Sequence, residues 1–318
     1  MAKRLPEEGS KPGAKASART VNLFRLSDLQ AELAKTPEGL KTGISSLDKL
    51  VIIPQAAVTI VAGRTGHGKT TMMFNLLVSM SRLYKDRAFV FFAYEEPRRQ
   101  LAVKLLNVLC GEVVDPECPA RNLSNLEDYL RKGRTDNPVI EQGKAELGRL
   151  LNSGRVLLED EPYTVEKWAE TLATICGRVP VGAVFVDYIQ KVRIRGEFST
   201  RQRELERISE RILDTAKSLS VPVILGAQLV RSPIHSDRVV LDDLLNAGDI
   251  EQDAQVILGL FNPAMEEAQD ESAPVVDSLM ELEVTVLKNR NGPVNGRVVL
   301  DFNWALLTLR QPEGASVT

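Results

Sequence analysis

The sequence has few of the residues that mark metal-bound, disulfide-linked or membrane-spanning proteins. Its 318 residues include three cysteines and two histidines, and no CxxC pair. These numbers exclude a zinc domain and a disulfide-stapled fold, and the sparse, odd cysteine count is typical of a reducing cytosol. No apolar run is long enough to cross a membrane, and the polar N-terminus is unlike a signal peptide. We therefore expect a cytoplasmic protein with no membrane partner.

An excess of charge of one sign is also missing. The formal net charge is −3, and 26% of the residues are charged. Any surface for nucleic acid must therefore be a local patch on a nearly neutral molecule. In contrast, 43% of the residues are hydrophobic, which is enough for a sizeable core and excludes a disordered or collagen-like chain.

Composition and periodicity divide the chain into unequal parts. Residues 1–20 mix Lys, Arg, Gly, Ser and Pro without periodicity and predict a disordered basic tail. Residues 21–39 predict an amphipathic linker helix, which packs either on its own domain or on a neighbouring subunit. Its apolar positions recur at helical spacing: Leu23, Leu26, Leu29 and Leu33. Residues 40–312 form one domain, and residues 313–318 form a short tail.

The main domain alternates short apolar runs with helical stretches, which predicts an α/β fold with a mostly parallel central sheet flanked by helices. The expected buried strands are Val58–Ala62, Phe89–Ala93, Val156–Leu158, Ala183–Val186, Val221–Ala227 and Val256–Phe261. The expected helices are Thr71–Leu83, Pro97–Leu109, Thr164–Cys176 and Arg201–Leu219. An antiparallel C-terminal extension is expected from Leu282–Leu287, Arg297–Phe302 and Ala305–Leu309.

A phosphate-binding loop is the most specific motif in the chain. Residues Gly63–Thr70 satisfy G-x-x-x-x-G-K-[ST], between an apolar strand and an amphipathic helix. Lys69 is expected to neutralise the β- and γ-phosphates of ATP, and the Thr70 hydroxyl is expected to bind Mg²⁺. His67 occupies a variable position and is expected to face solvent. The expected nucleotide-binding residues are Gly63, Arg64, Thr65, Gly66, His67, Gly68, Lys69, Thr70 and Thr71.

Three further polar residues follow apolar strands, where open parallel sheets place their chemistry. Asp187 ends a strand in the Walker B manner and is expected to hold Mg²⁺ with Thr70. Glu95 is the candidate base for the attacking water, whereas Glu96, which precedes a proline, suits a helix start better. Gln228 is a candidate sensor of the γ-phosphate, with a simple polar strand end as the alternative.

With these motifs in this order, the chain resembles the C-terminal motor domain of DnaB-type replicative helicases, which has a RecA-like fold. The resemblance runs from Thr42 to about Leu309 and includes motifs more specific than the phosphate loop. These are Tyr94-Glu95-Glu96-Pro97, Asp187-Tyr188-Ile189-Gln190, Gln228-Leu229-Val230-Arg231, Ile250-Glu251-Gln252-Asp253-Ala254 and Lys288-Asn289-Arg290-Asn291-Gly292-Pro293.

The resemblance implies a homo-oligomeric ring, a hexamer, with ATP bound between subunits. On this basis Arg290 is the arginine finger that reaches the neighbouring subunit's γ-phosphate, and Lys288 assists it. These two residues lie two apart on a strand-like run, so their side chains share one face. A basic pair without a partner in its own chain fits a phosphate that arrives from another subunit, and a solvated strand end is the alternative. The helix within residues 21–39 takes the place of the family's linker helix.

Two departures from the family pattern affect the functional prediction. Only a tail and linker precede the motor, so we expect a protein partner to supply the role of the family's N-terminal domain. In the central-channel loop the sequence reads Leu244-Leu245-Asn246-Ala247-Gly248, where the family carries an Arg-Glu pair. Asn246 and Gly248 keep the place of this DNA contact without its positive charge. The loop after Asp187 is basic, and Lys191, Arg193 and Arg195 are its candidates for binding single-stranded DNA, with a merely solvated basic loop as the alternative.

The function expected first is an ATP-dependent, ring-shaped DNA helicase or translocase that acts in DNA replication. The alternative is a DnaB-like ATPase that does not unwind DNA but remodels or loads a protein partner, which the altered channel loop favours. A recombinase of the RecA and KaiC kind shares the fold but is disfavoured by Asp187–Gln190 and Ile250–Ala254.

Overall fold

The computed structural model describes residues 38–113, 126–161, 163–229, 239–241, 248–267 and 279–312, together with Leu26, Asp28 and Gln30. The chain forms two compact units, Met1–Pro37 and Glu38–Thr318. In the first unit, Leu26, Asp28 and Gln30 are helical. The rest of the expected helix up to Pro37, and the expected tails 1–20 and 313–318, lie outside the described residues.

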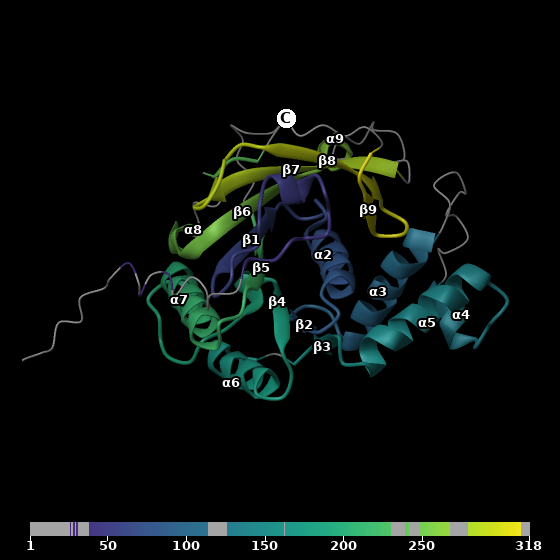
Figure 1. Ribbon diagram of the computed structural model, residues 1–318, viewed down its shortest axis with the longest axis horizontal. Helices are drawn as coiled ribbons and strands as arrows, with labels where there is room; N and C mark the ends of the chain where they lie inside the picture. The colour runs from purple at the N-terminus through teal and green to yellow at the C-terminus, as the bar shows by residue number, and fades with distance from the viewer. Residues whose placement is uncertain are drawn as a thin grey trace, which may run out of the picture. The chain divides into compact units, whose positions relative to one another are not determined.

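Within the second unit, the described strands form one nine-stranded sheet in the order β3-β2-β4-β5-β1-β6-β7-β8-β9 (Figure 1). The parallel strands are β1 (Val58–Gly63), β2 (Ala88–Ala93), β3 (Val156–Glu159), β4 (Val181–Asp187), β5 (Val223–Gln228) and β6 (Ala254–Phe261). The antiparallel strands are β7 (Leu279–Asn289), β8 (Arg297–Asn303) and β9 (Thr308–Arg310). The predicted fold class is therefore confirmed, and each predicted parallel strand overlaps an observed one.

Helices cover both faces of the parallel strands, which explains why these strands are apolar on both sides. One face carries α2 (Lys69–Leu83), α3 (Arg98–Val113) and α5 (Pro138–Asn152), and the other carries α6 (Val165–Cys176) and α7 (Arg201–Leu219) (Figure 1). Neighbouring residues of β2 show the alternation. Phe91 stacks on Phe74 of α2 at 4.7 Å between ring centroids, whereas Phe92 packs against Trp168 of α6 at 6.0 Å. Each face thus has its own hydrophobic core.

The structure adds helices that the sequence analysis did not predict, namely α4 (Leu126–Arg131), α5, α8 (Gly248–Asp253) and α9 (Pro263–Glu267), and two 3-10 turns, η1 (Leu47–Lys49) and η3 (Ile189–Lys191). The start of α5 carries a signal that was missed. The Asn137 side chain accepts hydrogen bonds from the amides of Val139 and Ile140, and Pro138 occupies the first helical turn.

The predicted strand Ala305–Leu309 is mostly wrong, because β9 begins only at Thr308. A turn precedes it. The amide of Leu306 donates to Asn303 Oδ1 at 3.0 Å, and Leu307 has a φ of 55°, so the chain reverses instead of extending. Among the described helices, none combines the length and the apolar character that crossing a membrane requires.

Candidate nucleotide-binding site

The phosphate loop joins the C-terminal end of β1 to the N-terminus of α2. Gly66 and Gly68 both have a φ of 82°, a left-handed conformation that glycine adopts without steric cost. Gly68 is the N-cap of α2, which begins at Lys69. The first amides of a 15-residue helix therefore point toward the loop, and this arrangement favours an anion such as a phosphate.

Side chains from β4 and α2 meet beside this loop. The Thr70 hydroxyl donates to Asp187 Oδ2 at 2.7 Å, although 117 residues separate them in the sequence. Lys69 Nζ donates to the carbonyl oxygens of Gly63 and Arg64, both at 2.9 Å. A hydroxyl and a carboxylate are hard oxygen donors, so Thr70 and Asp187 suit Mg²⁺ chemically. The two sequence motifs thus form one site.

The charged side chains of Lys69 and Asp187 are largely buried and therefore poorly solvated. Burial lowers the pKa of Lys69, and the negative charges of Asp187 and Glu95 oppose this effect. Burial raises the pKa of Asp187, opposed first by the hydrogen bond from Thr70 and then by the charge of Lys69. Because the ionised carboxylate is disfavoured here, a divalent cation beside it would restore its charged form.

Glu95 and Gln228 lie at the same cavity, as the strand-end argument predicted. The cavity has a volume of about 270 Å³ and is lined by Thr65, Gly66, Gly68, Lys69, Thr70, Thr71, Glu95, Asp187, Tyr188, Gln228, Phe302, Trp304 and Leu307. Gln228 Nε2 donates to Thr65 Oγ1 at 2.8 Å, so its amide faces the phosphate loop. Glu96 instead forms an ion pair with Lys104 of α3 and does not line this cavity.

Gln190 ends the Asp187–Gln190 motif and was not predicted as a site residue, but it makes a specific contact in the structure. Its amide nitrogen donates to the carbonyl oxygen of Gln228 at 3.1 Å, and its amide oxygen accepts from the Gln228 backbone amide at 3.2 Å. This pair of bonds ties the end of β5 to the turn after β4. The apolar residues Phe302, Trp304 and Leu307 were also not predicted as site residues, because the exposure of Trp304 and its place in a turn are visible only in the structure.

The expectation that His67 faces solvent is wrong. Its side chain is fully buried, and Nδ1 accepts a hydrogen bond from the amide of Asn262 at 3.1 Å. The imidazole also lies 5.7 Å from the ring of Phe261, measured between centroids. The end of β6 therefore packs against the loop, so the His67 side chain supports the loop from behind.

Lys288 and Arg290 lie toward the opposite end of the parallel strands. In the sheet register Lys288 pairs with Ile257, which pairs with Ile60, three residues before Gly63. At about 3.3 Å per residue, this is roughly 10 Å along the strand from the start of the phosphate loop. The pair therefore lies away from its own chain's loop.

The interpretation of this basic pair as unpaired in its own chain is wrong. Lys288 Nζ donates to the carbonyl oxygen of Glu251 at 2.5 Å, and an Arg290 guanidinium nitrogen donates to that of Gln252 at 2.6 Å. Both contacts lie near the C-terminal end of α8, where carbonyl groups attract cations. Both side chains reach the same end of α8, as their spacing predicted. Burial lowers the pKa of Lys288, and the nearby positive charge of Arg290 lowers it further.

The candidate DNA-binding residues fall into different environments. Lys191 Nζ lies 3.8 Å from Glu95 Oε1, beside the nucleotide cavity. The backbone carbonyl of Arg193 accepts from the amide of Val165 at 2.7 Å, and its guanidinium lies 3.6 Å from Glu204. The backbone amide of Arg195 donates to Glu166 at 3.1 Å, so the loop is held against α6 and α7. Gly248 begins α8, and Asn246 lies outside the described residues.

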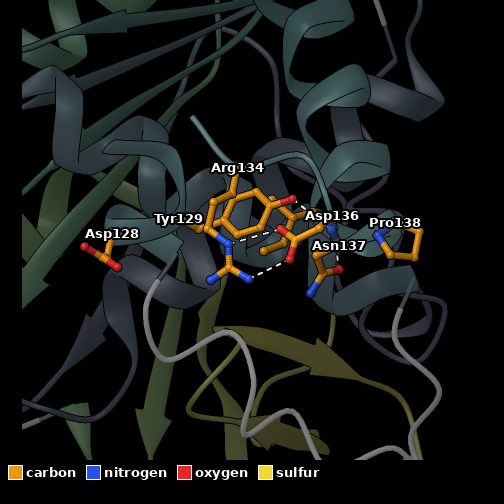
Figure 2. Close-up of a pocket in the computed structure, with 7 residues that line it drawn as sticks. Asp128, Tyr129, Arg134, Asp136, Asn137 and Pro138 are labelled. Carbon is orange, nitrogen blue, oxygen red and sulfur yellow. Dashed lines mark hydrogen bonds and ion pairs between the residues drawn. The ribbon is translucent and has the colours of Figure 1, made fainter. Parts of the chain in front are cut away.

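A second cavity, of about 440 Å³, lies where α4 meets α5 and has a different character (Figure 2). Two of its three charged lining residues, Arg134 and Asp136, are paired with each other, and the third, Asp128, is paired with Lys132 outside the lining. The Arg134 guanidinium faces Asp136, with bonds of 3.1 and 2.6 Å, and lies 5.3 Å from the centre of the Tyr129 ring (Figure 2). Its described lining contains no residue predicted for the nucleotide site, so we do not assign the nucleotide to it.

The chain is similar to known proteins of one family. Residues 39–310 match the family model of the DnaB-like helicase C terminal domain. The replicative DNA helicase DnaB of Mycoplasma genitalium is 28% identical over 273 residues, which cover 83% of this chain and 54% of the relative. DnaB of Buchnera aphidicola subsp. Acyrthosiphon pisum is 31% identical over 270 residues, again 83% of this chain and 54% of the relative. The chain thus spans about half the length of these curated relatives.

Solved structures show the same fold. An ATPase domain of known structure superposes with a TM-score of 0.72 at 21% identity, covering 90% of this chain and 97% of that one. A DnaB-like replicative helicase, whose structure was described with its interactions with primase, gives 0.71 at 20% identity and covers 93% and 68%. These likenesses establish the RecA-like fold.

Proposed function

Because the chain belongs to the DnaB-like helicase C terminal domain family, we propose that it is the motor of a ring-shaped, replicative-type DNA helicase. In this proposal, ATP hydrolysis between identical subunits moves the ring along single-stranded DNA. The observation that carries the proposal is the contact of Thr70 with Asp187 beside Lys69, in one cavity with Glu95 and Gln228. A P-loop ATPase needs this combination of groups at one place.

Each group has a role that follows from its position. The amides of the phosphate loop and Lys69 hold the phosphates, and Thr70 and Asp187 hold Mg²⁺. When bound, Mg²⁺ neutralises charge on the β- and γ-phosphates. Glu95, an exposed carboxylate on the cavity wall, orients the attacking water and accepts its proton. Gln228, already bonded to Thr65, responds to the γ-phosphate.

The reaction also needs positive charge at the γ-phosphate, which we assign to a neighbouring subunit. Lys288 and Arg290 are too far along the sheet to serve their own loop, but they are presented together on the end of α8. A basic pair of this kind suits a phosphate brought by another copy of the chain. This assignment favours a closed ring, and we propose a hexamer whose linker helix, within residues 21–39, packs on the next subunit.

We propose that the loop after β4 binds the single-stranded DNA along which the motor moves. The side chains of Arg193 and Arg195 offer positive charge to a phosphate backbone, and Lys191 of the same loop lies beside Glu95. Asn246 and Gly248 remain weaker candidates at the channel loop. Because Gln190 in the same loop is bonded to Gln228, a shift of the DNA-bound loop would reach the nucleotide cavity directly.

A second candidate is an ATPase that remodels or loads a protein partner without unwinding DNA. One observation favours it: the channel loop Leu244–Gly248 has no basic residue. In that case a protein partner would stimulate hydrolysis in place of DNA.

Hydrolysis of ATP with and without single-stranded DNA tests the proposal, with Lys69→Ala as the blank. We expect several-fold stimulation by DNA, and we expect the double variant Arg193→Ala, Arg195→Ala to lose the stimulation while keeping basal hydrolysis. The matched control is Arg207→Ala, which removes an exposed arginine of α7 that is paired with Glu210 at 2.6 Å. Robust hydrolysis that DNA does not stimulate would contradict the helicase proposal and support the protein-directed ATPase.

A further inference from the structure

The nucleotide cavity has an apolar end that the reaction described above does not use. It is formed by Phe302, Trp304 and Leu307, at the end of β8 and in the turn that follows. Phe302 is buried beneath the phosphate loop: a Cβ atom added to Gly68 would lie 3.6 Å from its ring. Phe302 is therefore structural, and the exposed surface of this end comes from its neighbour in the turn.

Trp304 is exposed to an extent that packing does not explain. Its side chain is 59% exposed, whereas Trp168 is 1% exposed and packs against Phe92. Burial of an indole is energetically favourable, because its apolar surface is among the largest of any side chain. An exposed aromatic on the wall of a cavity therefore indicates a ligand surface.

The turn that carries Trp304 is fixed to the helix that begins at the phosphate loop. Asn75, a buried residue of α2, donates from Nδ2 to the carbonyl oxygen of Leu307 at 2.8 Å. Its Oδ1 accepts from the amide of Leu309 at 3.0 Å. Asn75 lies six residues after Lys69 on the same helix, so the turn and the phosphate loop share one rigid frame. Trp304 is thus held at a set position relative to the phosphate loop.

We propose that the indole of Trp304 stacks on the base of the nucleotide whose phosphates the loop holds, and that this contact favours purine over pyrimidine nucleotides. The inference rests on the proposed function, since it needs a nucleotide at the loop. A purine offers the larger flat surface to an aromatic face, and the partly exposed apolar neighbour Leu307 suits a base plane better than a charged group. Stacking of this kind is an energetically substantial contact in proteins that hold bases.

Binding of three ligands separates this contact from the phosphate contacts. Affinities for ATP, CTP and inorganic tripolyphosphate, each with Mg²⁺, are measured for the unmodified protein, Trp304→Ala and Trp304→Phe. We expect Trp304→Ala to weaken ATP binding by about tenfold, to weaken CTP binding less, and to leave tripolyphosphate binding unchanged. Trp304→Phe restores most of the ATP affinity. The control Val294→Ala removes another exposed apolar side chain, 50% exposed and outside the cavity, and changes none of the three.

Three results would overturn the inference. Equal losses for ATP and tripolyphosphate would mean that Trp304 supports the phosphate loop. Unchanged ATP affinity with an altered particle mass in light scattering would make Trp304 a subunit-interface residue, and unchanged ATP affinity with lost DNA stimulation would make it a contact for DNA bases. Failure of the proposed function has a separate signature, because Lys69→Ala would then leave the binding of both ATP and tripolyphosphate intact.

Discussion

The two ends of the parallel strands carry charged groups of very different kinds. At the carboxyl ends, cation and anion meet: Lys69 lies near Asp187, and Asp187 is bonded to Thr70. Toward the amino ends, the side chains of Lys288 and Arg290 donate to backbone carbonyls of α8. In the proposed function, the first region binds a nucleotide and its metal. The second offers its positive charge to a phosphate held by another copy of the chain.

The largest expected effect comes from the basic pair. Arg290→Ala should lower the rate of hydrolysis by about 10³-fold, the range of an arginine finger, while nucleotide affinity stays within about twofold of the unmodified protein. Steady-state turnover and equilibrium binding of ATP measure the two quantities. Mixed with Lys69→Ala protein, the variant should recover hydrolysis, because one subunit then supplies the loop and its neighbour the arginine. No recovery in rings shown to be mixed would contradict action between subunits.

The opposite end of the strands should respond in binding as well as in rate. Lys69→Ala removes the cation of the phosphate loop, so we expect hydrolysis to fall by at least about 10²-fold and ATP affinity to fall with it. Calorimetric titration with a slowly hydrolysed ATP analogue checks the affinity. If this variant bound the analogue normally, the carboxyl ends of the parallel strands would not differ from the amino ends in binding the nucleotide.

Asp187→Asn should separate catalysis from stability. Hydrolysis should fall by roughly 10²-fold, because a neutral amide holds Mg²⁺ poorly. Without nucleotide the variant should melt higher at neutral pH, by roughly 2 °C. Burial raises the pKa of Asp187, so the folded state binds this proton more tightly than the unfolded state, and ionisation destabilises the fold.

The stability advantage of Asp187→Asn depends on pH in a definite direction. The stability associated with protonated Asp187 is present at low pH and is lost as the pH rises through its raised pKa. The advantage of Asp187→Asn should therefore shrink as the pH falls below that pKa, and hydrolysis by the unmodified protein should decline over the same range. Melting curves at several pH values, without nucleotide, measure the first effect, and an advantage that grows toward acid would contradict it.

The smallest expected effect concerns the support behind the phosphate loop. His67→Ala removes a buried ring and the acceptor for the Asn262 amide, so we expect a loss of about 2 kcal/mol in the free energy of unfolding. Urea denaturation measures this loss. A solvent-facing histidine would give a change near zero, and His67→Asn, which retains an acceptor, should lose less than His67→Ala.

Some parts of this arrangement could be read from local patterns, and others required distant contacts. Val58–Ala62 and Phe89–Ala93 were predictable as buried strands because they are continuously apolar, and the glycine pattern of the loop identified its phosphate chemistry. Helix α5 was missed, although Asn137-Pro138 marks its start. The short α8 offers too few residues for a helical period to be recognised.

The errors share one physical origin. His67 was expected in solvent and the Lys288–Arg290 pair was interpreted as unpaired, but each is engaged by a segment far away in the sequence. Asn262 is 195 residues from His67, and the carbonyl oxygen of Gln252 is 38 residues from Arg290. Periodicity reports only on a residue's near neighbours, so it does not reveal these contacts.

The sequence by itself determined the fold class, the phosphate loop, the order of the motifs and the gathering of Lys69, Thr70, Asp187, Glu95 and Gln228 at one edge of the sheet. These features depend on local backbone geometry and on the rule that parallel strands present their carboxyl ends together. Only the tertiary structure decided that His67 is buried, that α8 holds the basic pair and that Asn75 fixes the turn of Trp304 to α2. Those outcomes depend on which surfaces meet when distant segments pack, and packing is a property of the whole chain.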